Sequence, residues 1–262
     1  MEEKTMLDWT KFEPLFGTWA YKLKPFFDSG GFDPIYKLLK KDIRRGKKIV
    51  PSSSDTFRCF LETSFDDLKV VMMGMCPYHT MKNGQPVADG LLMGCSNTDY
   101  LQPSLDLFYK GVETELYEGL NLQYVKTPNV DYLAHQGVLM INAALTTEVN
   151  KPGSHLALWE PFIKYLFEEV LDASGVPVIF LGKEAAKMER YVAPFTWVFK
   201  ASHPASAAYT HTDWETEDVF KGVNKVLKDR NNFEINWLYV PEFRRRVKDD
   251  EGNPDAESDL PF

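Results

Sequence analysis

Three short polar stretches of this sequence hold residue types that could do chemistry, and each comes directly after an apolar run. Cys76 to His79 follow one run, Asn142 ends another, and Ser202 and His203 follow a third. Histidine and cysteine can exchange protons near neutral pH, and an asparagine amide both donates and accepts hydrogen bonds. The first stretch, MMGMCPYHT, is typical of the floor of an active site. Cys76 is either a catalyst there, a substitute for one, or the mark of a catalyst that has been lost.

The apolar runs are short and bounded by turn signals, which predicts buried strands. Their ranges are 68–73, 137–142, 176–182 and 197–201. Helical patterns cover residues 158–173 and 183–191, and residues 1 to about 60 are helical and rich in aromatic side chains. Strands that alternate with helices predict an α/β fold with a central parallel sheet. Ligands of such sheets bind beyond the carboxyl ends of the strands, where the polar stretches stand.

The length of 262 residues suits one domain or two small ones, and a hydrophobic share of 44% is enough for a sizeable core. It contains no apolar run of the about 18 residues that a transmembrane helix needs, and the N-terminal MEEKTMLDWTK does not resemble a signal peptide. Cys59, Cys76 and Cys95 are too widely spaced for a metal motif or a disulfide framework. We therefore expect a cytoplasmic protein with no membrane partner and no metal.

Charge is unevenly distributed along the chain. The net charge is -8, but the last fourteen residues hold six acids and no base. The remainder is close to neutral and carries basic stretches at 40–48 and 244–248, which could contact phosphate. We expect a folded domain over residues 1–243 and, over 244–262, a basic patch followed by a flexible acidic tail.

Three strings in this order carry a family resemblance: GMCPYH at 74–79, GVLMINAALTT at 137–147 and SHPASAAY at 202–209. Together they resemble the uracil-DNA glycosylases of the family-1 type. The resemblance implies a central parallel four-stranded sheet flanked by helices, with DNA bound across the strand ends. It also implies a monomer that flips uracil out of DNA and hydrolyses its N-glycosidic bond without a cofactor.

Four residues match the base pocket of that family. The resemblance implies that Asn142 binds the edge of uracil, that His203 hydrogen-bonds the uracil oxygen as charge builds there, that Tyr78 excludes a 5-methyl group, and that His79 helps to hold the attacking water. Read without the family, Asn142 could cap a turn at a strand end. His203 could be satisfied by backbone in a His-Pro turn, and Tyr78 could belong to the core.

Other pocket positions depart from the family. Cys76 stands where the family has the aspartate that activates water, and a thiol with a pKa of about 8.5 is only a few per cent ionised at neutral pH. Cys76 is then a small buried apolar residue or, alternatively, a nucleophilic or redox cysteine beside His79. Met75 replaces a glutamine and Met93 replaces the phenylalanine on which uracil stacks. Asp89 either supplies the missing carboxylate or only caps a turn.

The residues that grip DNA depart as well. The leucine wedge of the family becomes Ala207, and its two neighbouring serines become alanines. Ser104 is retained as a backbone contact, while Ser206 and Lys183 are candidates to compensate for lost phosphate contacts. The losses therefore fall on water activation, base stacking, intercalation and phosphate binding.

The C-terminal residues Asp259, Leu260, Pro261 and Phe262 resemble the acidic tip of bacterial single-stranded-DNA-binding proteins, which implies docking onto replication or repair proteins. The alternative is a tail that only aids solubility. Together the patterns favour a divergent, catalytically impaired glycosylase-fold protein that binds DNA, including single strands, and recruits such partners. The alternative function is an active DNA N-glycosylase that acts on uracil or a modified base.

Overall fold

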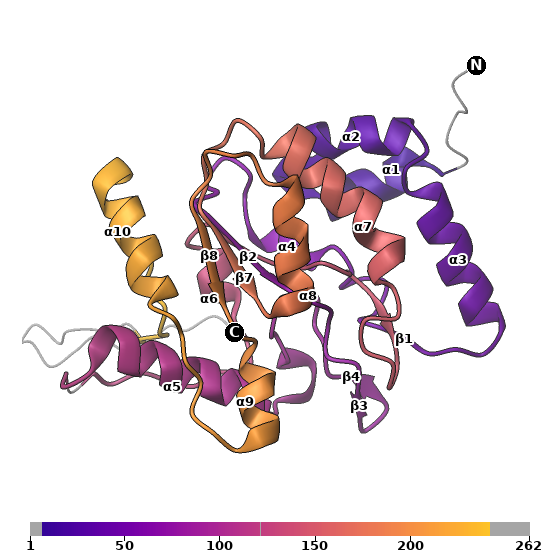
Figure 1. Cartoon of the computed structure of the whole chain (residues 1–262). Helices are drawn as coiled ribbons and strands as arrows, with labels where there is room; N and C mark the ends of the chain where they lie inside the picture. Colours follow the sequence, from indigo (N-terminus) through magenta and orange to yellow (C-terminus); the bar gives the residue numbers. More distant parts are fainter. Residues whose placement is uncertain (1–6, 121, 242–262) are drawn as a thin grey trace, which may run out of the picture.

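The computed structural model describes residues 7–120 and 122–241, and its centre is a four-stranded parallel sheet with the order β5-β2-β7-β8 (Figure 1). The strands are β2 (Val70–Gly74), β5 (Val138–Asn142), β7 (Val178–Leu181) and β8 (Val198–Ala201). Every residue of β2, β5 and β7 is buried, which explains their unbroken apolar sequences. The predicted sheet of four parallel strands flanked by helices is confirmed.

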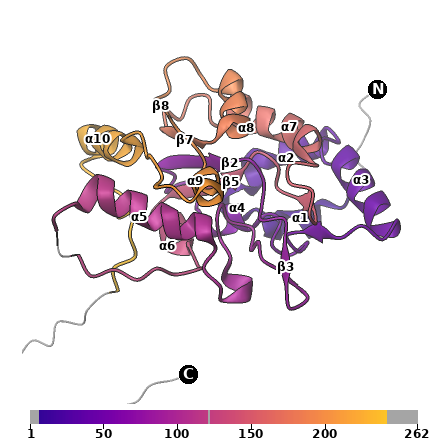
Figure 2. The same ribbon diagram turned by 60° about the horizontal axis from the view of Figure 1, so that its bottom comes forward.

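The register of the strands brings their carboxyl ends to one edge of the sheet. Gly74 at the end of β2 pairs with Asn142 at the end of β5, and Leu181 at the end of β7 pairs with Ala201 at the end of β8. The segments that follow the strands therefore leave the sheet together, and Figure 2 turns this edge toward the reader.

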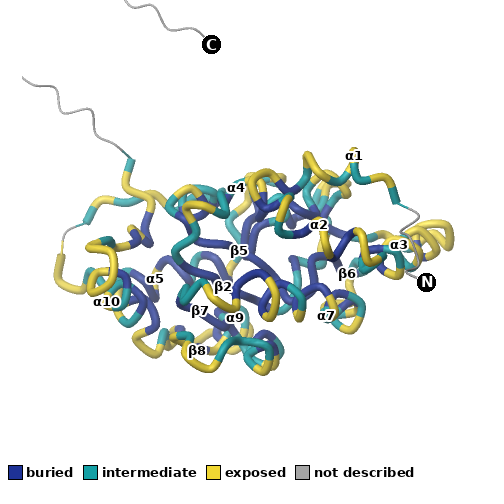
Figure 3. The backbone as a smooth tube through the Cα atoms, turned by 90° about the horizontal axis from the view of Figure 1, so that it is seen from above, coloured by how far each residue is buried: buried dark blue, intermediate teal, exposed yellow. Residues whose placement is uncertain are grey.

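Helices pack around the central sheet. They are α1 (Trp9–Phe12), α2 (Ala20–Asp28), α3 (Asp33–Arg44), α4 (Arg58–Glu62), α5 (Pro103–Tyr117), α6 (Asp131–Ala134), α7 (Leu156–Tyr165), α8 (Lys183–Ala186), α9 (Pro204–Thr210) and α10 (Val219–Asn231). Contacts join α4 and α6 to β5, α8 to β7, and α10 to β8. Figure 3 shows the buried strands in the middle of the molecule and the exposed segments around them.

Two predicted helices have a more irregular end than their sequence pattern indicated. After α7 the chain continues in a wider π-helical turn over Leu166–Val170, and after α8 it tightens into a 3₁₀ turn over Lys187–Tyr191. Shorter 3₁₀ turns cover Glu13–Leu15, Gly17–Trp19 and Ser96–Thr98.

An aromatic cluster anchors the N-terminal helices to the rest of the domain. The rings of Phe16 and Phe32 lie 5.8 Å apart, and Phe32 lies 5.3 Å from Phe162 of α7. The indole of Trp19 donates a 2.7 Å hydrogen bond to the carbonyl of Thr63. The aromatic richness of the N-terminal segment therefore serves the core.

Two small antiparallel sheets, which the sequence patterns did not predict, stand near the strand ends. One pairs β1 (Ile49–Val50) with β6 (Thr147–Glu148), and the other is the hairpin of β3 (Met81–Lys82) and β4 (Gln85–Pro86). The hairpin turns at Asn83-Gly84, where both residues have positive φ, as a type I′ turn requires. The Asn-Gly pair was thus a usable signal for this hairpin.

The predicted boundary at residue 243 and the acidic tail at 244–262 lie outside the described residues, so both remain predictions. Within residues 7–120 and 122–241, no helix is long and apolar enough to cross a membrane.

Candidate functional site

Residues from three strand ends meet on one floor at the carboxyl edge of the sheet. A Cβ atom placed on Gly74 would lie 3.0 Å from Oδ1 of Asn142 and 3.7 Å from Nε2 of His203, and it would overlap Leu92. Only a glycine at position 74 leaves this space open. The fold therefore brings together two predicted pocket residues that are 61 positions apart in the sequence.

The side chain of Asn142 has a buried hydrogen-bond acceptor without a partner among the described residues. It is only 3% exposed, and its buried Oδ1 accepts no hydrogen bond from any described residue. Buried acceptors are nearly always satisfied, and leaving one unsatisfied costs about 1–3 kcal/mol. A turn cap would use this oxygen within the chain. An acceptor that faces Gly74 instead favours recognition of a ligand N–H group.

His203 offers a hydrogen-bond donor to the same floor. Its Nδ1 accepts a 3.1 Å hydrogen bond from the backbone N–H of Ala205, so in the neutral ring the proton is on Nε2, which faces Gly74. Burial lowers the pKa of His203 to about 4, so the ring is neutral at pH 7. Asn142 and His203 thus present an acceptor and a donor to one space.

We expect the pKa of His203 to make stability depend on pH. Between about pH 6.5 and 4 the imidazole of His203 is protonated in the unfolded chain but stays neutral in the folded protein. The free energy of unfolding therefore falls as the pH drops through this window. Because the ring is partly exposed, we expect a total loss of about 1–2 kcal/mol relative to His203→Gln. Urea unfolding of both proteins at several pH values measures this difference, and parallel pH profiles would contradict it.

The loop after β2 holds Cys76 as a neutral thiol. Its Sγ accepts a 3.3 Å hydrogen bond from the backbone N–H of Gly153, and burial raises the pKa of the thiol despite that bond. Nearby, the carbonyl of His79 accepts a 2.8 Å hydrogen bond from the N–H of Asn150, and the buried Nδ1 of His79 has no partner among the described residues. A raised pKa disfavours the nucleophilic reading of Cys76.

Tyr78 and Ser104 are joined by a 2.8 Å hydrogen bond between their hydroxyl groups, and burial raises the pKa of Tyr78. Ser104 lies in the first turn of α5 and is only 4% exposed. Its hydroxyl thus orients Tyr78, and its predicted contact with a DNA phosphate is untested. Met93 is buried and Met75 is half-buried, so their predicted contacts with a base are also untested.

Helix α9 follows His203 and has one buried and one highly exposed side chain near its middle. Ala207, which the resemblance places at the wedge position, is buried, while Tyr209 is 80% exposed. Ser206 and Lys183 are exposed and accessible to a phosphate. Tyr209 was not singled out from the sequence, and helical periodicity places it on the same face of α9 as Ser206.

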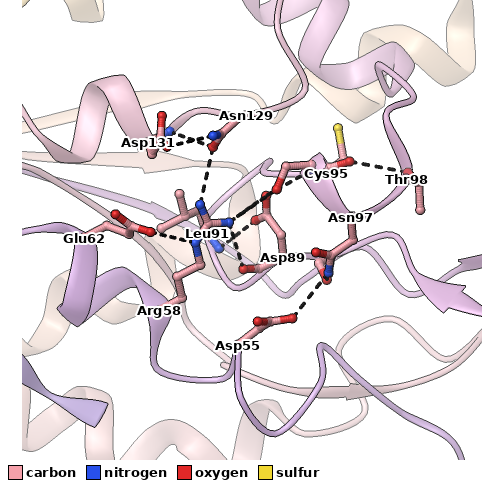
Figure 4. Close-up of polar contacts among 12 residues, drawn as sticks. Asp55, Arg58, Glu62, Asp89, Leu91, Cys95, Asn97, Thr98, Asn129 and Asp131 are labelled. Atoms are coloured by element: carbon pink, nitrogen blue, oxygen red, sulfur yellow. Dashed lines mark hydrogen bonds and ion pairs between the residues drawn. The ribbon is translucent and has the colours of Figure 1, made fainter. Parts of the chain in front are cut away.

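The carboxylate of Asp89 is fully engaged by partners within the chain (Figure 4). It is fully buried, and its Oδ2 lies 3.0 Å from Nη1 of Arg58. Its two carboxylate oxygens also accept hydrogen bonds from the N–H of Leu91 at 3.1 Å and from the N–H and hydroxyl of Ser96 at 3.0 and 2.7 Å. These partners use both oxygens, so Asp89 caps the turn over residues 90–96.

Comparisons with known proteins agree with this fold. Residues 62–228 match the sequence model of the uracil DNA glycosylase superfamily. The uracil-DNA glycosylase of Proteus mirabilis is 31% identical over 228 residues, which cover 85% of this chain and 94% of that protein. That of Bacillus cytotoxicus is 30% identical and covers 84% and 94%. The chain therefore belongs to the uracil-DNA glycosylase superfamily.

Solved structures show the same fold at lower identity. The crystal structure of mimivirus uracil-DNA glycosylase matches with a TM-score of 0.70 at 23% identity and covers 88% of this chain and 89% of that chain. A Nitratifractor salsuginis UNG structure matches with a TM-score of 0.56 at 18% identity, over 86% and 97% of the two chains.

Proposed function

We propose that this protein is a divergent glycosylase of the family-1 type that binds DNA at the carboxyl edge of its sheet but hydrolyses the glycosidic bond of uracil slowly or not at all. An extruded base would lie above Gly74, with Asn142 and His203 at its polar edge. Extrusion costs a few kcal/mol, which a single-stranded or damaged site reduces.

The observation that carries the proposal is the state of Cys76. A neutral thiol that accepts the Gly153 N–H neither deprotonates water well nor stabilises a cationic sugar by charge. Loss of a general base costs about 10² to 10⁴ in rate. Asp89, the next acidic residue along the chain, is held by Arg58.

An alternative function has one specific observation in its favour. The unpartnered acceptor of Asn142 and the neutral donor of His203 are arranged for a base, and such a pocket would serve excision of a modified base that leaves more easily than uracil. Efficient release of a modified base from DNA that the protein has bound would favour this alternative over the first proposal.

The C-terminal tip supplies the second half of the proposed function. Asp259 to Phe262 lie outside the described residues, and their sequence alone supports docking onto replication or repair proteins. An acidic tether with one terminal aromatic anchor suits a basic, apolar pocket on a partner.

Two variants test the two halves separately. Asn142→Ala is expected to leave the affinity for uracil-free DNA within about twofold, because most of that affinity comes from backbone phosphates. Deletion of residues 255–262 is expected to leave DNA binding intact and to abolish binding to a protein that recognises tips of bacterial single-stranded-DNA-binding proteins.

Fluorescence anisotropy with labelled DNA measures the first effect, and pull-down of the purified tip-binding protein measures the second. Full-length protein with Phe262→Ala is the matched variant for the deletion, because it keeps the acidic tail and removes only the terminal aromatic side chain. No DNA binding at low salt would overturn the first half, and unchanged pull-down by both tail variants would overturn the second.

A further inference from the structure

A basic groove lies between α1 and α3, away from the base pocket. The cavity has a volume of about 690 Å³, and six cationic side chains line it. They are Lys11, Lys37, Lys40, Lys41, Arg44 and Arg45, which we call the basic groove residues. Two acids, Asp8 and Asp33, share the lining.

The basic groove residues keep most of their charge available. None of the six forms an ion pair with another described residue, although ion pairs are common elsewhere on this surface. Asp8 is already engaged, because it caps α1 through the N–H and the hydroxyl of Thr10. The six cations outnumber the two acids of the lining, so the groove has a positive local potential that attracts polyanions.

A continuous set of contacts connects the end of α3 to the candidate site. Lys47 pairs with Asp42 of α3 at 2.9 Å and with Glu148 of β6 at 3.3 Å. Two residues past Glu148, the N–H of Asn150 binds the carbonyl of His79. In Figures 1 and 2, α3 lies on one flank of the edge that carries the site, and α10 lies on the opposite flank.

The groove also offers an aromatic surface. Tyr36 of α3 lines it and is 43% exposed, with Nζ of Lys40 5.3 Å from the centre of its ring. Cationic grooves with exposed aromatic rings are typical of single-stranded nucleic acid sites, where phosphates meet the charges and bases stack on the rings.

We propose that the basic groove binds the sugar-phosphate backbone of single-stranded DNA that continues past the base pocket, with Tyr36 stacking on a base. This inference rests on the proposed function, because it extends the same DNA path along α3. It makes the groove a second contact region for one strand.

The test uses full-length protein with Lys37→Gln, Lys40→Gln and Arg44→Gln combined, three exposed positions of α3. The matched control is Lys221→Gln, Lys225→Gln and Lys228→Gln on α10, which are also exposed. Affinity is measured by anisotropy for oligodeoxythymidine of about 5 and about 20 nucleotides, which bracket common site sizes, over a range of salt concentrations.

The α3 variant is expected to bind the long strand about tenfold more weakly at low salt, with a salt slope reduced by about 2, because each lost phosphate contact removes about 0.7. The short strand and the α10 variant are expected to bind like wild type. If wild type binds DNA, equal losses of affinity in both variants, or no loss in either, would contradict the proposed role of the groove. Wild type that binds neither strand would overturn the proposed function itself.

One further outcome would assign the groove to a different occupant. If the α3 variant keeps its DNA affinity but loses binding of a labelled DDEGNPDAESDLPF peptide, the groove receives the acidic tail and the DNA proposal is wrong.

Discussion

Cys76→Asp is expected to raise the rate of uracil release from DNA by about 10² to 10⁴ over wild type. An aspartate with a pKa near 3.9 is ionised at pH 7, so it can accept a proton from water and stabilise a cationic sugar. The N–H of Gly153, which now donates to Sγ, is placed to hydrogen-bond the new carboxylate. Single-turnover release from a uracil-containing oligonucleotide, with protein in excess, measures the change without interference from product release.

Cys76→Asn is the matched control, since it has the size of aspartate and no charge. It is expected to remain as slow as wild type. Equal rates for the aspartate and asparagine variants would show that shape, and not charge, limits the site. An inert Cys76→Asp protein that still binds DNA would place the defect in the other departures, such as Met75 and Met93.

Asp89→Ala is expected to lower the free energy of unfolding by about 3–5 kcal/mol. The substitution removes the buried one of the two carboxylates that pair with the Arg58 guanidinium, and it removes the acceptors of the Leu91 and Ser96 N–H groups. Urea unfolding followed by circular dichroism measures the loss.

Asp28→Ala is the comparison for this effect. Asp28 pairs with Lys24 at 2.7 Å, but its side chain is 55% exposed, so its removal is expected to cost less than about 1 kcal/mol. Similar small losses for the two variants would mean that Asp89 is not the cap of the turn over residues 90–96.

The sheet and the pocket floor were predictable because their signals are local. Short apolar runs predicted the four strands, and the rule that ligands bind beyond parallel strand ends predicted that Asn142 and His203 lie at the same edge of the sheet. The Asn-Gly turn at residues 83–84 was equally local, but the strands of its hairpin have only two residues each and are too short to show a strand pattern.

Other features depend on partners that lie far away in the sequence. The full engagement of Asp89 needs Arg58, 31 residues earlier, and the hydrogen bond to Sγ of Cys76 comes from Gly153, 77 residues later. Neither spacing follows a helical or strand period, so no sequence pattern indicates it.

The inward direction of Ala207 likewise comes from the packing of α9 against α5. The basic groove is a similar case. The basic stretch at 40–48 is apparent in the sequence, but only the fold brings it next to Lys11 of α1.

The most direct test of the central claim compares binding with chemistry in the wild-type protein. Uracil-containing single-stranded and duplex oligonucleotides are saturated with protein, as shown by anisotropy, and base release is then followed in the same samples. We predict that bound DNA keeps its uracil while Cys76→Asp releases it. Rapid release of uracil by wild-type protein would contradict the claim and would show that a partly buried thiol at position 76 suffices for catalysis.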